Sequence, residues 1–447
     1  MSLRLLFARW STAMTLLVTG GSFGIAQDGI RVREDIDILM QDPAKLSALK
    51  LAFQTLRDSN DPMNNLRFWA NIHGAVPPEM STGPCTHKEE GIWAWHRSYL
   101  WQFENALRNS HPPETSQVTL PYWNWVAPPS GQRYPKAYED TGSSLFWSRR
   151  ITTPQAQPPV PPDSETSLLS IPGWRVFGGV PDNESPGKGQ MEATVHDTVH
   201  GFVGKDMASP STSARDPIFW AHHANLDRIW LEWYAKWHQP PSEPTLLLPG
   251  VPGTQGDWVD VSMKYTYGPP AAQAPFVFDS HRAVAPEALK PLLQTEQALR
   301  LPATQERVLL KITDIEYPKD IGPFFCARVY LVPANMRTEG KERGFARSHY
   351  LAYFTDWITS HHHGTDQGAA KKTAITIDVT DRARAIQAAA GEMPLALSFE
   401  LTSQDDSGKK IPLKFGPNGV SFRATLEVVS IERGEMKSIQ ALHTKVR

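Results

Sequence analysis

Residues 216–230 read DPIFWAHHANLDRIW and are the most informative segment of the chain for its fold. Asp216 is a good N-cap residue and the proline after it suits the first helical position, so we predict a helix over Pro217–Trp237. This helix places His222 and His223 in an otherwise apolar and aromatic surface. A histidine in such a surface is either a core residue with a satisfied hydrogen bond or a metal ligand, and one helix alone does not decide between the two.

Histidines elsewhere in the chain favour the metal ligand. His196 and His200 are four residues apart, so a helix over residues 194–202 would present both imidazoles on one face, where they can share a metal. His223, on the next helix, completes a trio. A second trio lies upstream, with predicted helices over residues 66–73 and 93–108 beside it: His73, His87 and His96.

The six candidate ligands are all imidazoles. Imidazole suits Cu, Zn, Fe and Ni, whereas Mg and Ca require oxygen ligands. A structural zinc site would more typically include cysteine thiolates. Two neutral histidine trios fit two copper ions that bind oxygen between them. The residues alone therefore predict a dinuclear histidine-rich metal site, with copper favoured over zinc or iron.

Composition limits the remaining possibilities. The chain has 447 residues, of which 40% are hydrophobic and 21% charged, as in a soluble protein with a large core. Its formal net charge of -2 gives no basic field for nucleic acid or an anionic membrane, so we expect neither as a partner. A small or neutral substrate fits better, and the oligomeric state stays open.

The texture of the sequence changes along the chain. Helical periodicity, which also covers residues 45–57, is confined to the first 240 residues, between long Pro-rich loops. After residue 300, short runs rich in Val, Ile, Leu and aromatics indicate an all-β sandwich. These runs are residues 307–315, 326–332, 349–354, 373–379, 395–401 and 422–429.

The N-terminus has the pattern of an export signal. Arg4 and Arg9 precede a short apolar stretch, and a small-residue cleavage site follows near Ala26. We therefore expect a mature protein that is exported, periplasmic or secreted. The expected division is a signal peptide over 1–26, a catalytic domain over 27–270, a linker over 271–300, a β-rich domain over 301–435 and a tail over 436–447.

Two segments resemble the copper-binding regions of type 3 copper proteins, which are tyrosinases, catechol oxidases and molluscan-type haemocyanins. They are residues 216–230 and the string LPYWNW at residues 120–125. The resemblance covers residues 30–270 and extends more weakly over the β-rich part. It implies a mainly α catalytic domain, a four-helix bundle with long loops around two copper ions, with O2 as co-substrate. It also implies a C-terminal all-β sandwich-like domain that covers the site and keeps the enzyme latent.

The resemblance assigns the ligands position by position. His73, His87 and His96 hold one copper, and His196, His200 and His223 hold the other. His223 is the ligand of the adjacent pair because it stands four residues before Asp227, and His222 is its neighbour. Phe219 matches an aromatic that packs between the copper sites, although ordinary core packing would explain it equally well.

Cys85 stands two residues before His87. In many relatives this spacing accompanies a thioether bond between the cysteine sulfur and the imidazole, which would fix the ring of a loop-borne ligand. The alternative is a free cysteine or a disulfide with Cys326, since these are the two cysteines of the chain.

Further positions match residues that set activity in the family. Glu192 corresponds to a water-holding glutamate that assists proton removal from a phenol. Asp197 stands where many tyrosinases have Asn, which makes monophenol hydroxylation plausible; otherwise it is a solvated helix residue. Pro210 falls at the gate over the copper, where it would leave the entrance open to bulky phenols. Gly201, at the rim after His200, adds no charge.

The tyrosine motif that closes such domains is found as Tyr265 and Tyr267, and Arg31 or Arg33 is its expected cation–π partner. Later in the chain, residues 354–357 and 376–381 resemble parts of the shielding domain. His361, His362 and His363 form either a solvated loop tip or a transient copper-capture site.

The sequence therefore predicts a tyrosinase-like polyphenol oxidase that converts phenols or catechols to o-quinones with O2. A strict catechol oxidase or an o-aminophenol oxidase would use the same ligands. A haemocyanin-like oxygen carrier and a non-catalytic protein with zinc in the histidine site are the more distant alternatives.

Overall fold

The computed structural model describes residues 29–446 with internal gaps. The gaps are 75–84, 127–134, 152–159, 162, 182–186, 272–289, 292–305, 319–323, 334–348, 358–373, 392, 394, 405–409, 414, 416–418 and 433–434. The expected signal peptide, nearly all of the expected linker and the triple histidine at 361–363 lie outside the described residues.

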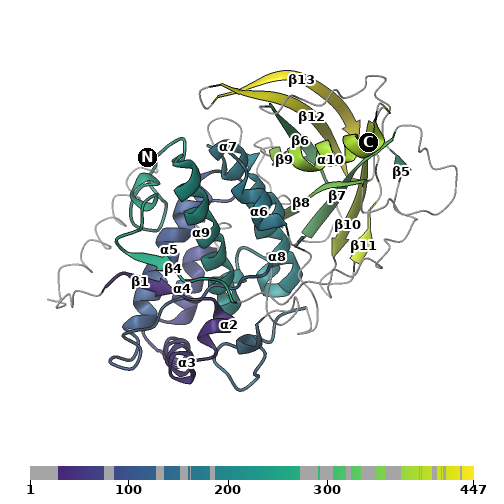
Figure 1. Cartoon of the computed structure of the whole chain (residues 1–447). Coiled ribbons are helices and arrows are strands. Elements are labelled where there is room, and N and C mark those ends of the chain that lie inside the picture. Colours follow the sequence, from purple (N-terminus) through teal and green to yellow (C-terminus); the bar gives the residue numbers. More distant parts are fainter. Residues whose placement is uncertain are drawn as a thin grey trace, which may run out of the picture.

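The helical region, residues 29–271, contains all of the predicted metal ligands (Figure 1). Its α-helices are α2 (Ile36–Leu39), α3 (Pro43–Asp58), α4 (Leu66–His73), α5 (Gly91–Arg108), α6 (Ser164–Leu169), α7 (Trp174–Phe177), α8 (Asp197–Val203) and α9 (Pro217–Trp237). A π-helix, η3 (Met191–His196), leads directly into α8, and short 3-10 helices cover Lys136–Tyr138, Lys205–Ala208, Ser213–Arg215 and Gly256–Trp258.

Local signals place the helix starts. Asp216 accepts a hydrogen bond from the Ile218 amide at 3.0 Å, and Pro217 takes the first helical position, so α9 has the predicted bounds. Asn65 caps α4 in the same way by accepting from the Phe68 amide at 2.8 Å. Two of the histidine-bearing helices, α4 and α9, are therefore fixed at their N-terminal ends by side chains of their own sequence.

Aromatic side chains fill the space between α5 and α9. Trp95, Trp220, Trp230 and Trp233 are almost completely buried, and the Phe103 ring stacks on Trp220 with centroids 3.5 Å apart. Each large apolar side chain removed from water contributes about 2–3 kcal/mol. This core holds the two helices in contact where they carry the predicted ligands His96 and His223.

The C-terminal β region, residues 306–446, lies to one side of the helices (Figure 1). Its strands are β6 (Glu306–Glu316), β7 (Phe324–Pro333), β8 (Tyr350–Trp357), β9 (Ala374–Asp378), β10 (Leu395–Gln404), β11 (Lys410–Pro412), β12 (Ser421–Glu432) and β13 (Glu435–Val446). One sheet has the order β11-β10-β7-β8, and β5 (Lys290–Pro291) also pairs with β10. The six predicted strands are thereby confirmed.

The second sheet crosses the expected domain boundary. Its order is β13-β12-β6-β9-β3-β2, where β2 (Gly179–Val180) and β3 (Gly187–Lys188) belong to the helical region. Strand β3 pairs in parallel with β9, with Gly187 opposite Ala374 and Lys188 opposite Ile375. A hairpin of the helical region thus extends a sheet of the C-terminal β region.

Three expectations about the C-terminal half were wrong. The domain is not all-β, because Thr380–Ala390 forms helix α10, whose alternating Ala and Arg residues have high helix propensity. Residues 436–446 are no separate tail, since β13 pairs with β12 along its length. Residues 437–439 are exposed, as expected of a polar edge strand that shows no apolar run in the sequence. Finally, Lys290–Pro291, in the expected linker, joins the first sheet.

At the other end of the helical region, β1 (Arg31–Arg33) pairs in parallel with β4 (Tyr265–Tyr267). This pairing ties the start of the described chain to the end of the helical region. Within the part of the chain that the structure describes, no helix is both long and apolar enough to cross a membrane.

Candidate metal centre

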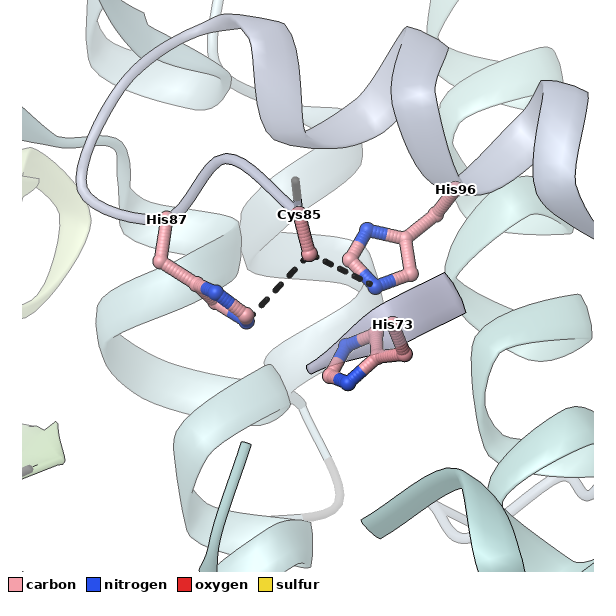
Figure 2. Close-up of side chains that lie close together, drawn as sticks. All are labelled: His73, Cys85, His87 and His96. Atoms are coloured by element: carbon pink, nitrogen blue, oxygen red, sulfur yellow. Dashed lines mark hydrogen bonds between the residues drawn. The ribbon is translucent and has the colours of Figure 1, made fainter. Parts of the chain in front are cut away.

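The first trio, His73, His87 and His96, converges from three segments. His73 ends α4, His87 lies in the loop before α5, and His96 is in the second turn of α5. A ligand atom of each histidine and the Cys85 sulfur all lie within 4.8 Å of one another. Figure 2 shows the Cys85 side chain pointing between the His87 and His96 rings, with His73 facing them.

The second trio, His196, His200 and His223, is borne entirely by helices. His196 is the last residue of η3, His200 lies one turn later on α8, and His223 lies on α9. Ligand atoms of these residues and of His222 again lie within 4.8 Å of one another. The Nε2 atoms of His200 and His223 are 3.2 Å apart, so both rings point at the same place.

Hydrogen bonds fix which nitrogen each imidazole offers. The Nδ1 atom lies 2.7 Å from the Pro210 carbonyl in His73, 2.8 Å from the Ile92 carbonyl in His96 and 2.7 Å from the Met207 carbonyl in His200. A carbonyl oxygen only accepts, so Nδ1 carries the proton and Nε2 carries the lone pair. This is the arrangement of metal-binding histidines.

The site also keeps the imidazoles neutral. Burial lowers the pKa of His73 to about 4, and burial lowers the pKa of the other five predicted ligands well below the ordinary value. Neutral imidazole is the form that binds metal. The Nε2 atom of His73 is buried with no hydrogen-bond partner among the described residues. A buried Nε2 atom without a partner, within a set of six neutral imidazoles, fits a copper ion.

The structure distinguishes the two adjacent histidines of α9. The indole N–H of Trp125 donates to His222 Nδ1 at 3.0 Å, which occupies that lone pair and leaves the proton on Nε2. His222 then has no lone pair to offer a metal. His223, facing His200, is the remaining candidate from α9.

The two trios face each other. The His96 and His223 rings stack with centroids 4.0 Å apart and planes 9° apart, and the His87 and His196 centroids are 5.6 Å apart. The Phe219 ring lies 4.9 Å from the His73 ring and 4.2 Å from the His223 ring. Phe219 therefore packs between the trios, and two metal ions held by them would be neighbours.

Two buried carboxylates adjoin the second trio. Glu192 accepts from the Lys88 amide at 2.9 Å through Oε1, and its Oε2 is buried with no hydrogen-bond partner among the described residues. Burial raises the pKa of Glu192 to about 8. Asp197 Oδ1 lies 2.7 Å from His196 Nδ1, and burial raises the pKa of Asp197 to about 6 although Lys188 opposes that shift. Asp197 is thus no solvated helix residue.

Lys188 and Asp356 are site residues that the sequence reasoning missed. The Lys188 ammonium donates to Asp197 and also lies 2.6 Å from Asp356 Oδ1, with both side chains about 1% exposed or less. Burial lowers the pKa of Lys188, but Asp197 and Asp356 together raise it above its ordinary value. A lysine between two glycines and an aspartate far along the chain give no sequence signal that they meet.

Asp227 organises the far side of α9. Its carboxylate accepts from Arg97 and from Arg33, the latter at 3.1 Å, and from the hydroxyls of Tyr265 at 2.7 Å and Tyr267 at 2.6 Å. Burial raises the pKa of Asp227, but the two arginines lower it below the ordinary value.

Of the two candidate arginines, Arg33 lies over the Tyr265 ring at 3.8 Å. Arg31 instead lies over the Trp101 ring at 4.0 Å and pairs with Glu104 at 2.9 Å. Both arginines therefore fasten the chain start to the helical core.

Pro210 and Gly201, the residues expected at the gate and at the rim, lie in surroundings that differ from each other. The Pro210 carbonyl lies against His73, so its backbone adjoins the first trio, and its role as a gate stays a prediction. Gly201 is buried on α8 directly after His200. Cys85 and Cys326 form no disulfide.

Two facing trios of neutral imidazoles, oriented by carbonyls and a carboxylate, form a candidate dinuclear metal centre. The profile of the common central domain of tyrosinase matches residues 63–158 and 147–236, which span all six ligands. The chain is 29% identical over 253 residues to a tyrosinase of Hahella sp. strain CCB-MM4 and 32% identical over 181 residues to a chloroplastic polyphenol oxidase of Malus domestica. These matches cover 46% and 33% of this chain, and 54% and 30% of the relatives.

Solved structures show the same fold. A structure of latent apple tyrosinase has a TM-score of 0.62 at 20% identity, covering 93% of this chain and 98% of that one. Recombinant mushroom tyrosinase has a TM-score of 0.55 at 14% identity, covering 93% and 97%. The resemblance therefore includes the C-terminal β region as well as the helices.

Residues 63–236 therefore resemble the central domain of tyrosinase, and the fold of the chain resembles that of solved tyrosinases. The chain spans about half the length, or less, of the curated relatives that it matches.

Proposed function

We propose that this protein is a copper-dependent oxidase that converts phenols or catechols to o-quinones with O2. The observation that carries the proposal is the pair of facing trios, in which six neutral imidazoles come together without a carboxylate ligand. Such donors suit copper. The tyrosinases and polyphenol oxidases among the relatives support the same activity.

When bound, the two copper ions would supply the redox chemistry that couples oxidation of the phenol to reduction of O2 to water. The first trio would hold one ion and the second trio the other. Burial of five of the six ligands, with His87 partly exposed, would limit the access of bulk water to the metals.

Glu192 is the proposed proton acceptor. A phenol with a pKa near 10 must lose its hydroxyl proton before it is oxidised, and a nearby base with a pKa close to the working pH serves best. Burial raises the pKa of Glu192 to about 8, and its Oε2 has no competing partner among the described residues. Asp197 keeps its own carboxylate on His196, so it would orient that ligand while Glu192 holds the proton or a water.

We further propose a thioether between Cys85 and the His87 ring. The sulfur lies 3.9 Å from His87 Nε2, and the bond would fix the one ligand that lies on a loop. Bond formation joins the sulfur to a ring carbon and breaks the S–H and the ring C–H bond, with O2 as the oxidant that would accept the two electrons and two protons. The intact mass of the copper-loaded chain should therefore fall by two hydrogens below the sequence mass. The Cys85→Ala variant should show no such loss, and an unmodified wild-type mass would refute the bond.

The C-terminal β region would act as a shield. The Thr355 hydroxyl of β8 donates to the Ala193 carbonyl of η3 at 2.7 Å, so this region rests directly on the ligand-bearing segment. We propose an exported, latent enzyme with a four-helix bundle around the metals and a sandwich-like shield. The catalytic part would cover residues 27–270, and cleavage in the 271–300 linker would activate it.

Oxygen uptake and quinone absorbance test the function. Copper-loaded chain should turn over a catechol, and faster after limited proteolysis in the linker. Turnover of L-tyrosine as well would establish monophenolase activity, whereas turnover of catechol or o-aminophenol alone would establish the narrower enzyme. Reversible oxygen binding without turnover would favour the haemocyanin-like oxygen carrier. A chain that holds zinc but no copper would favour the non-catalytic protein.

A further inference from the structure

A carboxylate of the C-terminal β region is buried beside the metal centre. Asp356, on β8, lies with Oδ1 2.6 Å from the Lys188 ammonium and 3.4 Å from the Lys88 ammonium, while the Tyr317 hydroxyl donates to Oδ2 at 2.6 Å. Its side chain is completely buried. Burial raises the pKa of Asp356, but the two lysines lower it well below its ordinary range. Asp356 is therefore an anion at neutral pH.

The contact continues inward to a metal ligand. The same Lys188 ammonium donates to Asp197 Oδ2, and the other oxygen of Asp197 lies 2.7 Å from His196 Nδ1. Asp356, Lys188, Asp197 and His196 thus form a continuous buried chain of charged groups and one imidazole. One lysine is shared by a carboxylate from each region.

Backbone contacts hold the same segment. Strand β3, which carries Lys188, is paired with β9, and the Asp378 amide donates to Gln190 Oε1 at 2.8 Å. Thr355, next to Asp356, bonds the Ala193 carbonyl within η3. From Lys188 to His196, the segment that leads to the second trio is therefore docked on the C-terminal β region at several points.

We propose that Lys188 is a positioning residue. Through Lys188, contact with the C-terminal β region would raise the affinity of the second trio for its copper ion. Asp356 fixes the Lys188 ammonium, Lys188 fixes the Asp197 carboxylate, and Asp197 fixes the orientation and tautomer of His196. The inference rests on the copper centre of the proposed function. It adds that the C-terminal β region supports the second metal site as well as covering it.

The physical reason is the cost of a poorly held buried ion. The charge of a buried ammonium is neutralised by the two carboxylates beside it. When one carboxylate is removed, the ammonium and the remaining carboxylate can move to other positions. Groups that hold a metal-binding histidine typically change metal affinity by about 10–100-fold when removed. The first trio lacks such a chain at His73 and His96, whose Nδ1 atoms bond to backbone carbonyls of the helical region.

The test uses the full chain with Asp356→Asn, Lys188→Met and the double variant. Glu400→Gln is the matched control, because Glu400 is a buried carboxylate paired with Arg328 at 3.3 Å wholly within the C-terminal β region. Copper content is measured, then the rate at which each copper passes to a chelator. Amide exchange over residues 191–203 is measured on the copper-free chain.

Wild type and Glu400→Gln should lose both coppers slowly. Asp356→Asn and Lys188→Met should release one copper about 10-fold faster with the other unchanged, and the double variant should be no faster than Lys188→Met. Amide exchange over residues 191–203 should rise in the copper-free Asp356→Asn chain. If Lys188→Met does not fold, the near-isosteric Asp356→Asn decides alone.

Two results would overturn the inference. Asp356→Asn could speed amide exchange in β3 and β9 while copper release and exchange over residues 191–203 match wild type, which would make Asp356 a docking residue only. Equal acceleration of both coppers would indicate general loosening. A wild-type chain that binds no copper would instead refute the proposed function, and the exchange data on the copper-free chain would still decide the coupling.

Discussion

The two histidine trios face each other but are held in different ways. In the first trio, His73 and His96 are oriented by backbone carbonyls of the helical region, and His87 stands on a loop beside a thiol. In the second trio, all ligands lie on helices, and His196 is oriented by a carboxylate whose lysine is shared with Asp356. The first trio is oriented mainly within the helical region, although Lys88, next to His87, lies 3.4 Å from Asp356. The orientation of His196 in the second trio depends on the Lys188 contact with the same aspartate.

This difference predicts that the two metal sites respond differently to side-chain substitutions. Backbone carbonyls cannot be removed without moving a helix or a loop, so the first site should tolerate side-chain changes around it. Side-chain carboxylates and ammonium groups can be lost or displaced, so the second site should respond to changes far from the metal.

Replacing a ligand of the second trio should have the largest effect. His223→Ala should lose one copper and lower catechol turnover by roughly 10³-fold or more, because a metal ion contributes several kcal/mol to the reaction. His222→Ala is the matched control, since the Trp125 indole already occupies its Nδ1. Metal analysis and oxygen uptake check both variants, and loss of copper from His222→Ala with retention in His223→Ala would reverse the assignment.

Asp227→Asn should destabilise the fold rather than the metal site. Asp227 compensates Arg97 and Arg33 in a fully buried cluster, and breaking such a cluster costs about 3–5 kcal/mol. We expect a lower midpoint of chemical denaturation in both the copper-free and the copper-loaded chain. A loss confined to the copper-loaded chain would place Asp227 in the metal site instead.

Asp197→Ala should weaken one copper site and leave the other. Loss of the group that holds His196 should lower affinity for the second copper by about 10–100-fold. Ser213→Ala is the control at the first trio, because its hydroxyl lies 3.4 Å from His73 Nδ1 while the Pro210 carbonyl lies at 2.7 Å. Copper titration should show one weakened site in Asp197→Ala and two normal sites in Ser213→Ala.

The pH dependence of the copper-free chain should be gradual. Burial lowers the pKa of His73 to about 4, so between the ordinary value near 6.5 and about 4 the unfolded chain binds the proton and the folded chain does not. Stability is therefore full above pH 6.5 and declines as the pH falls toward 4. Denaturation midpoints at several pH values check this, and copper should delay the decline because protons then compete with metal.

Local signals made much of the fold predictable. The cap at Asp216 with Pro217 fixed the start of α9, and the apolar runs located six strands. Helix α10 and strand β13 were missed because an Ala-Arg stretch between strands and a polar edge strand show no apolar run. The π-helix η3 was not predicted, because hydrophobic periodicity does not distinguish a π-helix from an α-helix. Its contact with β8 becomes visible only in the fold.

The candidate ligands were readable because histidine is rare and its spacing is regular on a helix. The groups that orient these ligands were harder to predict from the sequence. Asp197 stands beside His196 in sequence, but the Met207 and Pro210 carbonyls belong to loops whose course depends on the whole fold. Lys188 and Asp356 meet only because a hairpin of the helical region joins a sheet of the C-terminal β region.

The most direct test of the account is oxygen uptake by the full chain loaded with two copper ions, with a catechol as substrate, before and after cleavage in the 271–300 linker. We predict quinone formation with two coppers bound per chain, and a faster rate after cleavage. A chain that binds two coppers and oxygen but leaves catechol unchanged in both forms would contradict the proposed oxidase.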